Sequence, residues 1–399
     1  MSRFAVLVWL CLQPLISQTG AFAQGHPPSQ VILEGQEAIY HLQYDKAGEI
    51  FTKTRNDYPS SPVGYGMLSI LAWNQLLFES SNFALDDYST PSPFVKARTR
   101  KPIAPATRRF HQANDALLAK CEELLNRDPN DVRALYFQGL GYENLAAEAL
   151  VISKDDRAAS SYGRRAKRIH ERGLELDRNL VDAKVSLAAY DFAADNLPWS
   201  LRLFAFLLGI RGDEQRAFQR LREVAEKGEY RRYDAWLLLG LVKAWKGKRE
   251  YAAEAVDVFE ILRRKFPENF LLDLNLAAMY EKNDPRSALK LYESLLAALP
   301  SKAKGLEPGE VWWRMGRCNY RLRNYDQALQ AFGKALDAPR SEKETAPLVR
   351  YYQGLIHETQ GDRARAIQCY QAAVKDQSLT AISKEIYDAR RRLEKLMGS

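Results

Sequence analysis

The sequence predicts an all-α protein built from about eight stacked helix pairs and one further helix at the C-terminal end. Small and large apolar residues recur at fixed helical spacings, and the recurrence keeps its phase over a shift of 38 residues, from Gly316 to Gly354. Prolines such as Pro267 and Pro300 follow the repeated segments, where a residue without a backbone N–H ends a helix. No long alternation of β-branched residues occurs, so strands are not expected.

The recurrence is clearest in the last third of the chain. Five marks, separated by 4, 12, 4 and 3 positions, define it: Trp312, Gly316, Ala328, Phe332 and Ala335. A shift of 38 residues places four similar residues on the same marks: Gly354, Ala366, Tyr370 and Ala373. The second half of the pattern recurs upstream in three further segments that each end on a proline: 47–59, 255–267 and 288–300. The chain is therefore expected to repeat one structural unit.

This pattern resembles the tetratricopeptide repeat, in which W-x2-L-G-x2-Y is followed by A-x3-F, A and P. The resemblance implies a right-handed α-α superhelix, a solenoid of antiparallel helix pairs. Small residues such as Gly316 and Ala328 then sit where two paired helices approach closely, and large ones such as Phe332 fill the space between pairs. One pair cannot bury its own apolar face, so neighbouring pairs must stack.

The repeat pattern also predicts the helices and the division of the chain. First helices of the pairs are expected near 31–43, 62–78, 131–149, 180–194, 231–246, 269–281, 307–321 and 345–360. Second helices are expected near 45–57, 105–126, 158–176, 213–227, 250–265, 285–297, 325–337 and 363–375. The predicted parts are a signal peptide (1–23), a first repeat-like unit (24–60), degenerate pairs (61–232), regular repeats (233–378) and a charged capping helix (379–399).

The first 23 residues predict a cleaved signal peptide. Arg3 is the only cation before Lys46, an apolar run follows it, and Ala21 and Ala23 supply the small residues that precede cleavage. We expect cleavage after Ala23 and export to the periplasm or out of the cell. No later segment reaches about 18 consecutive apolar residues, so no transmembrane helix is expected in the mature chain.

Two insertions interrupt the rhythm of the degenerate part, at 79–105 and 195–212. The first combines acidic, Ser/Pro-rich and basic stretches and is typical of either a linker or a functional loop. The second contains Leu197–Ile210, in which Arg202 is the only charged residue. Such a segment either packs onto the solenoid as an extra helix or makes a peripheral contact with a membrane or partner, and the sequence leaves both open.

Residues that carry catalysis or bind metals are not grouped in this sequence. The five histidines lie far apart, no HExxH occurs, and Cys121, Cys318 and Cys369 form no CxxC pair. Neither a phosphate-binding GxxxxGK[ST] loop nor a GxSxG nucleophile motif is present. We therefore predict no metal, no cofactor and no enzymatic activity. The balance of 58 basic against 50 acidic residues is mildly positive and dispersed, which does not by itself favour nucleic acid.

The resemblance also implies where a partner binds. In tetratricopeptide arrays the first helix of each pair lines a concave groove. Carried over position by position, this implies nine partner-binding residues: Arg133, Tyr136, Glu143, Glu310, Trp313, Arg317, Tyr320, Tyr351 and Glu358. Aromatic and arginine side chains are common anchors of interfaces. The alternative is that the aromatic residues only pack against neighbouring helices.

Taken together, these features predict an exported scaffold or adaptor that holds segments of partner proteins in the groove of its superhelix. One alternative is a peripheral envelope organiser that binds anionic surfaces, since the chain carries a formal charge of +8. Another is a glycan-processing enzyme, which needs two carboxylates facing each other across a cleft. The sequence pairs no two carboxylates in that way.

Overall fold

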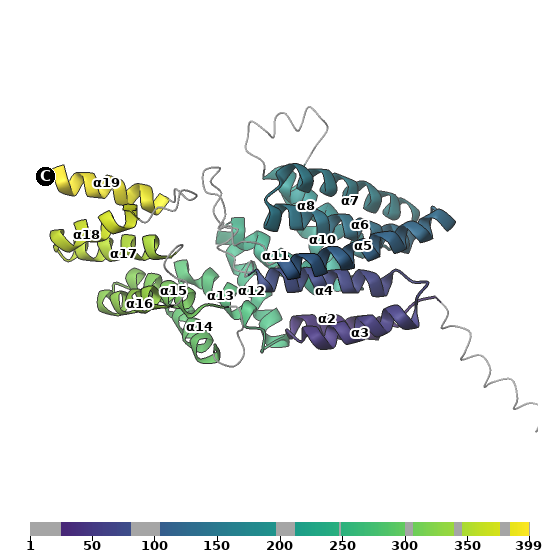
Figure 1. The fold of residues 1–399 in the computed structure, drawn as a ribbon, viewed down its shortest axis with the longest axis horizontal. Helices are drawn as coiled ribbons and strands as arrows, with labels where there is room; N and C mark the ends of the chain where they lie inside the picture. The colour runs from purple at the N-terminus through teal and green to yellow at the C-terminus, as the bar shows by residue number, and fades with distance from the viewer. Residues whose placement is uncertain are drawn as a thin grey trace, which may run out of the picture. The chain divides into compact units, whose positions relative to one another are not determined.

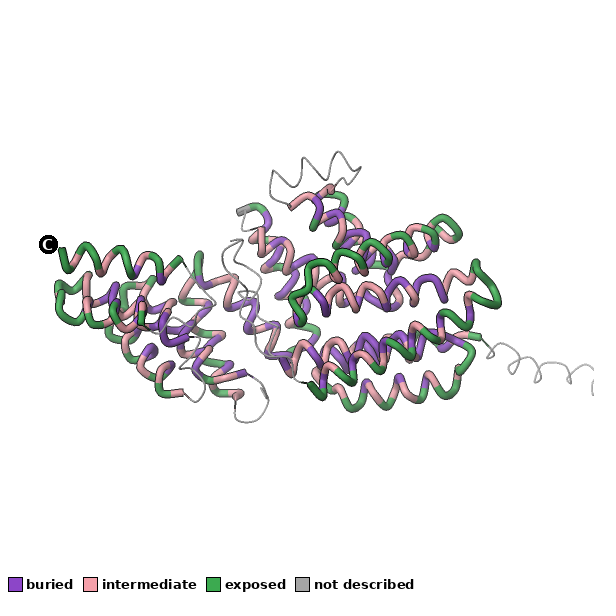
Figure 2. Tube along the Cα trace, turned by 45° about the horizontal axis from the view of Figure 1, so that its top comes forward, coloured by how far each residue is buried: buried purple, intermediate pink, exposed green. Residues whose placement is uncertain are grey.

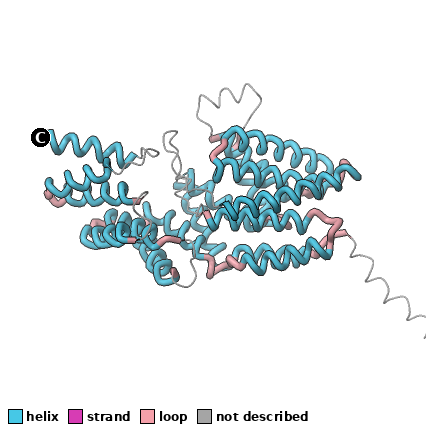
Figure 3. Tube along the Cα trace, viewed as in Figure 1, coloured by secondary structure: helices cyan, strands magenta, loops and turns pink. Residues whose placement is uncertain are grey.

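The computed structural model describes residues 25–80, 104–196, 212–246, 249–299, 306–338, 345–375 and 384–398. Throughout these ranges the regular elements are helices (Figures 1 and 3). None of the helices so described is both long and apolar enough to cross a membrane. The predicted signal peptide, most of the insertion at 79–105 and the whole of Leu197–Ile210 lie outside the described residues.

The chain divides into two compact units. The first comprises residues 1–74 and 107–232, and the second comprises 75–106 and 233–399, so that α4 and α5 contribute to both. Helices of the first unit and its boundary are α2 (Ser29–Tyr40), α3 (Tyr44–Asp57), α4 (Val63–Glu79), α5 (Ala104–Arg127), α6 (Val132–Glu148), α7 (Asp156–Leu176), α8 (Lys184–Asp195) and α10 (Glu214–Lys227). In this unit α2 packs on α3, α6 on α7 and α8 on α10.

The second unit continues the same arrangement. Its helices are α11 (Arg232–Lys246), α12 (Arg249–Lys265), α13 (Phe270–Asn283), α14 (Pro285–Ala298), α15 (Pro308–Arg321), α16 (Tyr325–Asp337), α17 (Ala346–Thr359), α18 (Arg363–Lys375) and α19 (Lys384–Gly398). Here α13 packs on α14, α15 on α16 and α17 on α18, and α19 covers α17 and α18. The predicted all-α fold of repeated helix pairs is confirmed, and most helix ends lie within two or three residues of their predicted positions.

A glycine on the first helix and a ring on the second hold the pairs together. A Cβ added to Gly316 would come within 3.0 Å of the Phe332 ring, and one added to Gly354 would meet Tyr370 in the same way. Three earlier pairs repeat this relation: Gly35 with Phe51, Gly139 with His170, and Gly240 with Phe259. The ring therefore occupies the space that any other residue would fill, and the close approach predicted at Gly316 is observed.

The turn inside several pairs depends on one left-handed residue. Leu42, Arg323 and Gly361 all have positive φ, at 59°, 61° and 80°, and each follows the first helix of its pair. Such a residue at the helix C-terminus satisfies the last carbonyls and reverses the chain. This turn explains why α2 ends at Tyr40 although the sequence pattern suggested a helix to residue 43.

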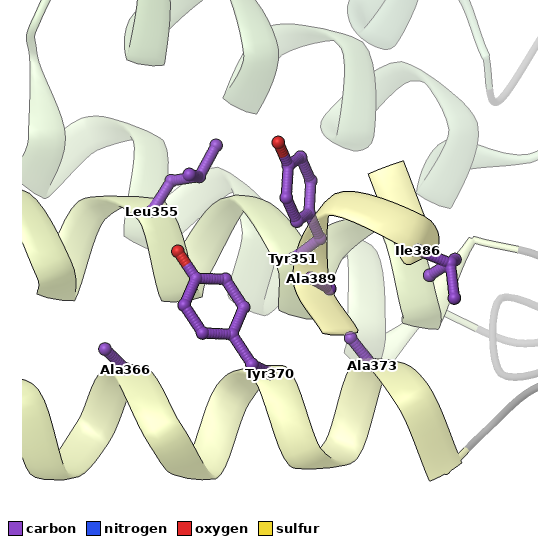
Figure 4. Packing of buried hydrophobic residues seen from close by; sticks show 7 residues of the cluster. All are labelled: Tyr351, Leu355, Ala366, Tyr370, Ala373, Ile386 and Ala389. Atoms are coloured by element: carbon purple, nitrogen blue, oxygen red, sulfur yellow. The ribbon is translucent and has the colours of Figure 1, made fainter. Parts of the chain in front are cut away.

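The cores lie between successive pairs. In the second unit, Trp313, Phe332, Val349 and Ile356 are buried in one cluster between α15, α16 and α17. The next cluster joins α17, α18 and α19, and Figure 4 shows its buried members: Tyr351, Leu355, Ala366, Tyr370, Ala373, Ile386 and Ala389. Buried and exposed stretches alternate along the helices in Figure 2, as expected when each helix buries one face.

Candidate functional site

The first helices of the last repeats form a continuous surface within the second unit. Helix α13 contacts α15, α15 contacts α17, and α17 contacts α19. Six of the nine predicted partner-binding residues lie on two of these helices: Glu310, Trp313, Arg317 and Tyr320 on α15, and Tyr351 and Glu358 on α17. We call the part of this surface formed by α13, α15 and α17 the A-helix surface.

Arg317 is held in place from two sides. Its Nη2 is ion-paired with Oε2 of Glu281 on α13, and its guanidinium carbon lies 5.4 Å from the centroid of the Trp313 ring. The Arg317 side chain nevertheless keeps 20% of its exposure. A guanidinium fixed by a carboxylate and an aromatic face loses little conformational freedom when it binds a further acceptor.

Glu281 is the buried centre of this group, because its side chain is only 2% exposed. The hydroxyl of Tyr292 donates to Oε1 of Glu281 at 2.7 Å, and Nη1 of Arg314 lies 3.6 Å from the same oxygen. Arg314 is equally buried, and its Nε donates to Glu310 at 3.0 Å. Two arginines, a tyrosine and two carboxylates thus satisfy one another, which a buried charge requires.

The aromatic residues of α15 differ in their exposure. Trp313 is 3% exposed and its ring lies edge-on to Tyr352, at 5.3 Å between centroids. Tyr320 also meets Tyr352 edge-on at 5.3 Å, but it is only partly buried. Trp313 therefore packs against a neighbouring helix, as the alternative interpretation of the aromatic residues stated. Tyr320, in contrast, retains surface that a partner can reach.

Glu358 and Tyr351 of α17 are engaged by the last helix. Nη1 of Arg392 lies 3.0 Å from Oε2 of Glu358, and Tyr370 donates to the same oxygen at 2.7 Å. The Tyr351 hydroxyl donates to Asp388 at 2.8 Å. Burial and then this hydrogen bond raise the pKa of Tyr351. Burial opposes ionisation of Asp388, but the hydrogen bonds from Arg392 and Tyr351 outweigh it and lower the pKa of that carboxyl.

The three predicted residues of the first unit form a separate group. Tyr136 is 1% exposed and stacks on His170 and Tyr230, at 5.6 and 5.2 Å between centroids. Glu143 lies 3.2 Å from Nη1 of Arg231, and Arg133 is partly buried. Tyr136 therefore belongs to a core, while Glu143 and Arg133 keep partial access to solvent.

The sequence reasoning missed Glu281, although a signal for it exists. Tyr320 and Glu358 each follow the small residue of their helix, Gly316 and Gly354, by four positions. Glu281 follows Ala277 by the same four positions in the preceding repeat. Extending the repeat frame one unit upstream would have identified it. Asp388 and Arg392 were missed because the last helix was interpreted only as a cap.

The A-helix surface combines partly exposed arginine, tyrosine and carboxylate groups in fixed positions. It can donate to carbonyl or carboxylate groups through Arg317 and accept from amides through Glu358. Among the described residues, no group of three or more His, Cys, Asp or Glu side chains could hold a metal ion. These features suit the recognition of a polypeptide segment.

Comparisons with known proteins found one family model and several similar solved structures. A tetratricopeptide-repeat family model matches residues 278–344 and, in a second, overlapping match, 314–381. The chain is similar to the structure titled APC/C hetero-tetramer Cut9-Hcn1 (14% identity, TM-score 0.49, covering 92% of this chain and 55% of that chain). It is also similar to yeast Tom70 (13% identity, TM-score 0.42, covering 92% of this chain and 95% of that chain). A third similar structure is the human IFIT1 dimer with PPP-AAAA (14% identity, TM-score 0.42, covering 92% of this chain and 84% of that chain). The chain spans about half the length of the Cut9-Hcn1 chain that it matches, at 55%.

Proposed function

We propose, from the premise that this chain is a tetratricopeptide-repeat protein, that it binds a segment of a partner protein on the A-helix surface of its second unit. Tetratricopeptide repeats serve in general as protein-interaction scaffolds. The matched repeats, residues 278–381, contain α15 and α17 entirely. The match supports this choice, because α15 and α17 belong to the part of the chain where the repeat is most regular.

The observation that carries the proposal is the fixed position of Arg317. Its ion pair with the buried Glu281 and its contact with the Trp313 ring hold the guanidinium at the surface of α15. The partly buried Tyr320 lies one helical turn away on the same helix. Arginine and tyrosine held in this way are the residue types that dominate binding energy at protein interfaces. Buried Trp313 then acts as support for Arg317 and not as a contact residue.

A photo-crosslinking experiment tests where the partner binds. A benzophenone amino acid is placed at position 320 of the full chain, and at position 387 in a matched chain. Tyr387 is the control because it is 65% exposed in the same unit but belongs to α19, outside the A-helix surface. We expect a crosslinked protein at position 320 only, identified by its mass. A crosslink of equal yield at position 387 would overturn the assignment.

The crosslinked partner is then purified and its affinity measured against single variants. Tyr320→Ala should weaken binding by about tenfold or more, because truncating an interface anchor costs more than about 1 kcal/mol. Tyr387→Ala removes a side chain of the same kind and should leave the affinity unchanged. Equal affinities of wild type and Tyr320→Ala would remove this surface from consideration.

We further propose that the protein acts outside the cytoplasm. The support is the arrangement of Arg3, the apolar run and Ala21-Phe22-Ala23 at the start of the sequence. Expression of the full chain in a bacterial host, followed by fractionation and N-terminal sequencing, tests this. We expect a chain that begins at Gln24 in the envelope fraction. A chain that retains Phe4–Leu12 and stays in the cytosol would contradict it.

A further inference from the structure

The outer face of α7 carries a row of arginines in the first unit. Five of its exposed residues are Arg157, Arg164, Arg165, Arg168 and Arg172. Successive residues of an α-helix are rotated by about 100°, so Arg157, Arg164, Arg168 and Arg172 fall on one stripe about 23 Å long. Arg165 lies beside this stripe. The opposite face buries Ala166, His170 and Gly173 against the rest of the unit. We call these five residues the arginine stripe.

The arginine stripe is not neutralised by the chain itself. In the described ranges, none of its five members is ion-paired with a carboxylate. Arg164 donates to Ser160 Oγ at 2.6 Å, Arg172 donates to the carbonyl of Pro129 at 2.8 Å, and the Arg165 guanidinium carbon lies 4.1 Å from the ring centroid of Tyr142. These contacts orient guanidinium groups without cancelling their charge.

Several other basic residues of the first unit are ion-paired. Lys53 lies 2.6 Å from Asp57 on α3, and Arg127 lies 2.6 Å from Glu123 on α5. On α7 itself, Lys167 beside the stripe is paired with Glu171. What distinguishes α7 is that five exposed arginines without an ion pair to any described residue lie on one helix face.

We propose that the arginine stripe binds the phosphate groups of an anionic phospholipid surface. Guanidinium groups match phosphate oxygens in a bidentate geometry, and a straight exposed helix presents them in a row to a flat sheet of headgroups. Beyond Arg172 the same face continues to the exposed carboxylate of Glu175, and Leu176, which is 45% exposed, supplies an apolar side chain at the edge of the stripe. The stripe lies in the other unit from the A-helix surface, so this binding is additional to the proposed protein interaction.

The composition of the stripe favours lipid over a protein partner. Between Arg157 and Arg172, the exposed residues of α7 are only arginines and the serines Ser160 and Ser161. A protein interface of ordinary size needs an apolar or aromatic centre from which water is excluded. A lipid surface needs only a row of cations, each of which contributes electrostatic attraction that salt weakens.

Co-sedimentation of the full chain with vesicles tests the proposal. Vesicles of phosphatidylcholine with phosphatidylglycerol are compared with vesicles of phosphatidylcholine alone, at low and at high salt. The test variant is Arg164→Gln/Arg168→Gln/Arg172→Gln. The charge-matched control is Lys53→Gln/Arg127→Gln/Lys375→Gln, which removes three exposed cations elsewhere. Circular dichroism establishes that both variants remain folded.

Wild type should bind the vesicles that contain phosphatidylglycerol, and high salt should weaken this binding. The stripe variant should bind on the order of 100-fold more weakly, because each arginine near an anionic surface contributes about fivefold. The control variant should bind within about twofold of wild type. Equal loss in both variants, or none in the stripe variant, would overturn the proposal. So would a stripe variant that loses binding to a duplex RNA probe while it keeps its binding to the vesicles.

Discussion

The hydroxyl of Tyr292 donates to the carboxylate of Glu281 at 2.7 Å, across the pair formed by α13 and α14. The same relation recurs two repeats later, where Tyr370 donates to Glu358 at 2.7 Å. In both cases the carboxylate lies in the last turn of the first helix, and the tyrosine occupies the ring position of the second. The pair is therefore a polar version of the contact that joins the two helices of a repeat.

The repeat between these two, formed by α15 and α16, has neither the glutamate nor the tyrosine at these positions. Its first helix carries Tyr320 at the carboxylate position, and its second helix carries Phe332 at the ring position. A carboxylate opposite Phe332 would have no donor there, and a buried charge without a donor is costly. The exchange of both residues at once is consistent with a requirement that buried polar groups be satisfied.

Tyr292→Phe should destabilise the second unit by about 1.5–3 kcal/mol, because it removes a hydrogen bond to a charged acceptor that is 2% exposed. Tyr370→Phe is the matched control. Its acceptor, Glu358, is 31% exposed and can exchange the hydroxyl for water, so a loss below about 1 kcal/mol is expected. Urea denaturation of the full chain measures both. Equal losses would mean that burial of the acceptor does not set the cost.

Glu281→Gln should destabilise by about 3 kcal/mol or more. It leaves Arg314, whose side chain is 2% exposed, and Arg317 without their shared carboxylate. Removing one member of a buried ionic group leaves uncompensated charge, which costs more than the group contributes as a whole. Glu394→Gln is the control, because Glu394 is exposed on α19 and should change stability by less than about 0.5 kcal/mol. A result for Glu281→Gln that matches this control would show that Glu310 alone neutralises Arg314.

The helices could be predicted from the sequence because their signals are local. The interval from Gly316 to Phe332 and the interval from Gly354 to Tyr370 are both 16 residues, and each describes one contact within one helix pair. Such a contact depends only on the two helices and their turn. The repeat frame therefore fixed the helix pairs and their order without knowledge of the neighbouring repeats.

The exposure of individual site residues could not be predicted in the same way. Trp313 is buried because Tyr352 of the following repeat meets its ring, and Glu358 is engaged because Arg392 of α19 reaches it. Both contacts come from a different repeat, at sequence separations that the pattern within one unit does not encode. The position of a residue in the repeat predicts which helix face it occupies, whereas its accessibility depends on the side chains of the next repeat.

Two glycines, one on each helix of the same pair, test the close approach of the helices. Gly316→Ala should destabilise by about 1–3 kcal/mol, because the new methyl group would come within 3.0 Å of the Phe332 ring. Gly333→Ala lies in the next helix, where an added Cβ meets nothing within 4 Å, and it should stabilise by about 0.5–1 kcal/mol. Thermal unfolding measures both shifts. Stabilisation by both substitutions would contradict the packing described here.

His170 gives the first unit a predictable response to acid. It takes the ring position opposite Gly139, is 1% exposed, and its Nε2 lies 3.0 Å from the carbonyl of Tyr136. Burial lowers the pKa of His170 below its ordinary value of 6.5. The unfolded chain therefore binds more protons than the folded chain between the folded-state pKa of His170 and about pH 6.5. The stability that neutral His170 provides is complete above that pH and is lost as the pH falls toward its folded-state pKa.

We therefore expect the free energy of unfolding to fall between pH 7.5 and pH 5.5 with a contribution from His170 of at most about 1.4 kcal/mol per pH unit. His170→Phe restores the common ring of the repeat and cannot be protonated, and His170→Gln cannot be protonated either. Both variants should lose this contribution, whatever their absolute stabilities, because linkage depends only on the proton that each state binds. Urea denaturation at the two pH values measures the slopes. If either variant kept the wild-type slope, the acid response would arise from other groups of the first unit, and burial of His170 would not control it.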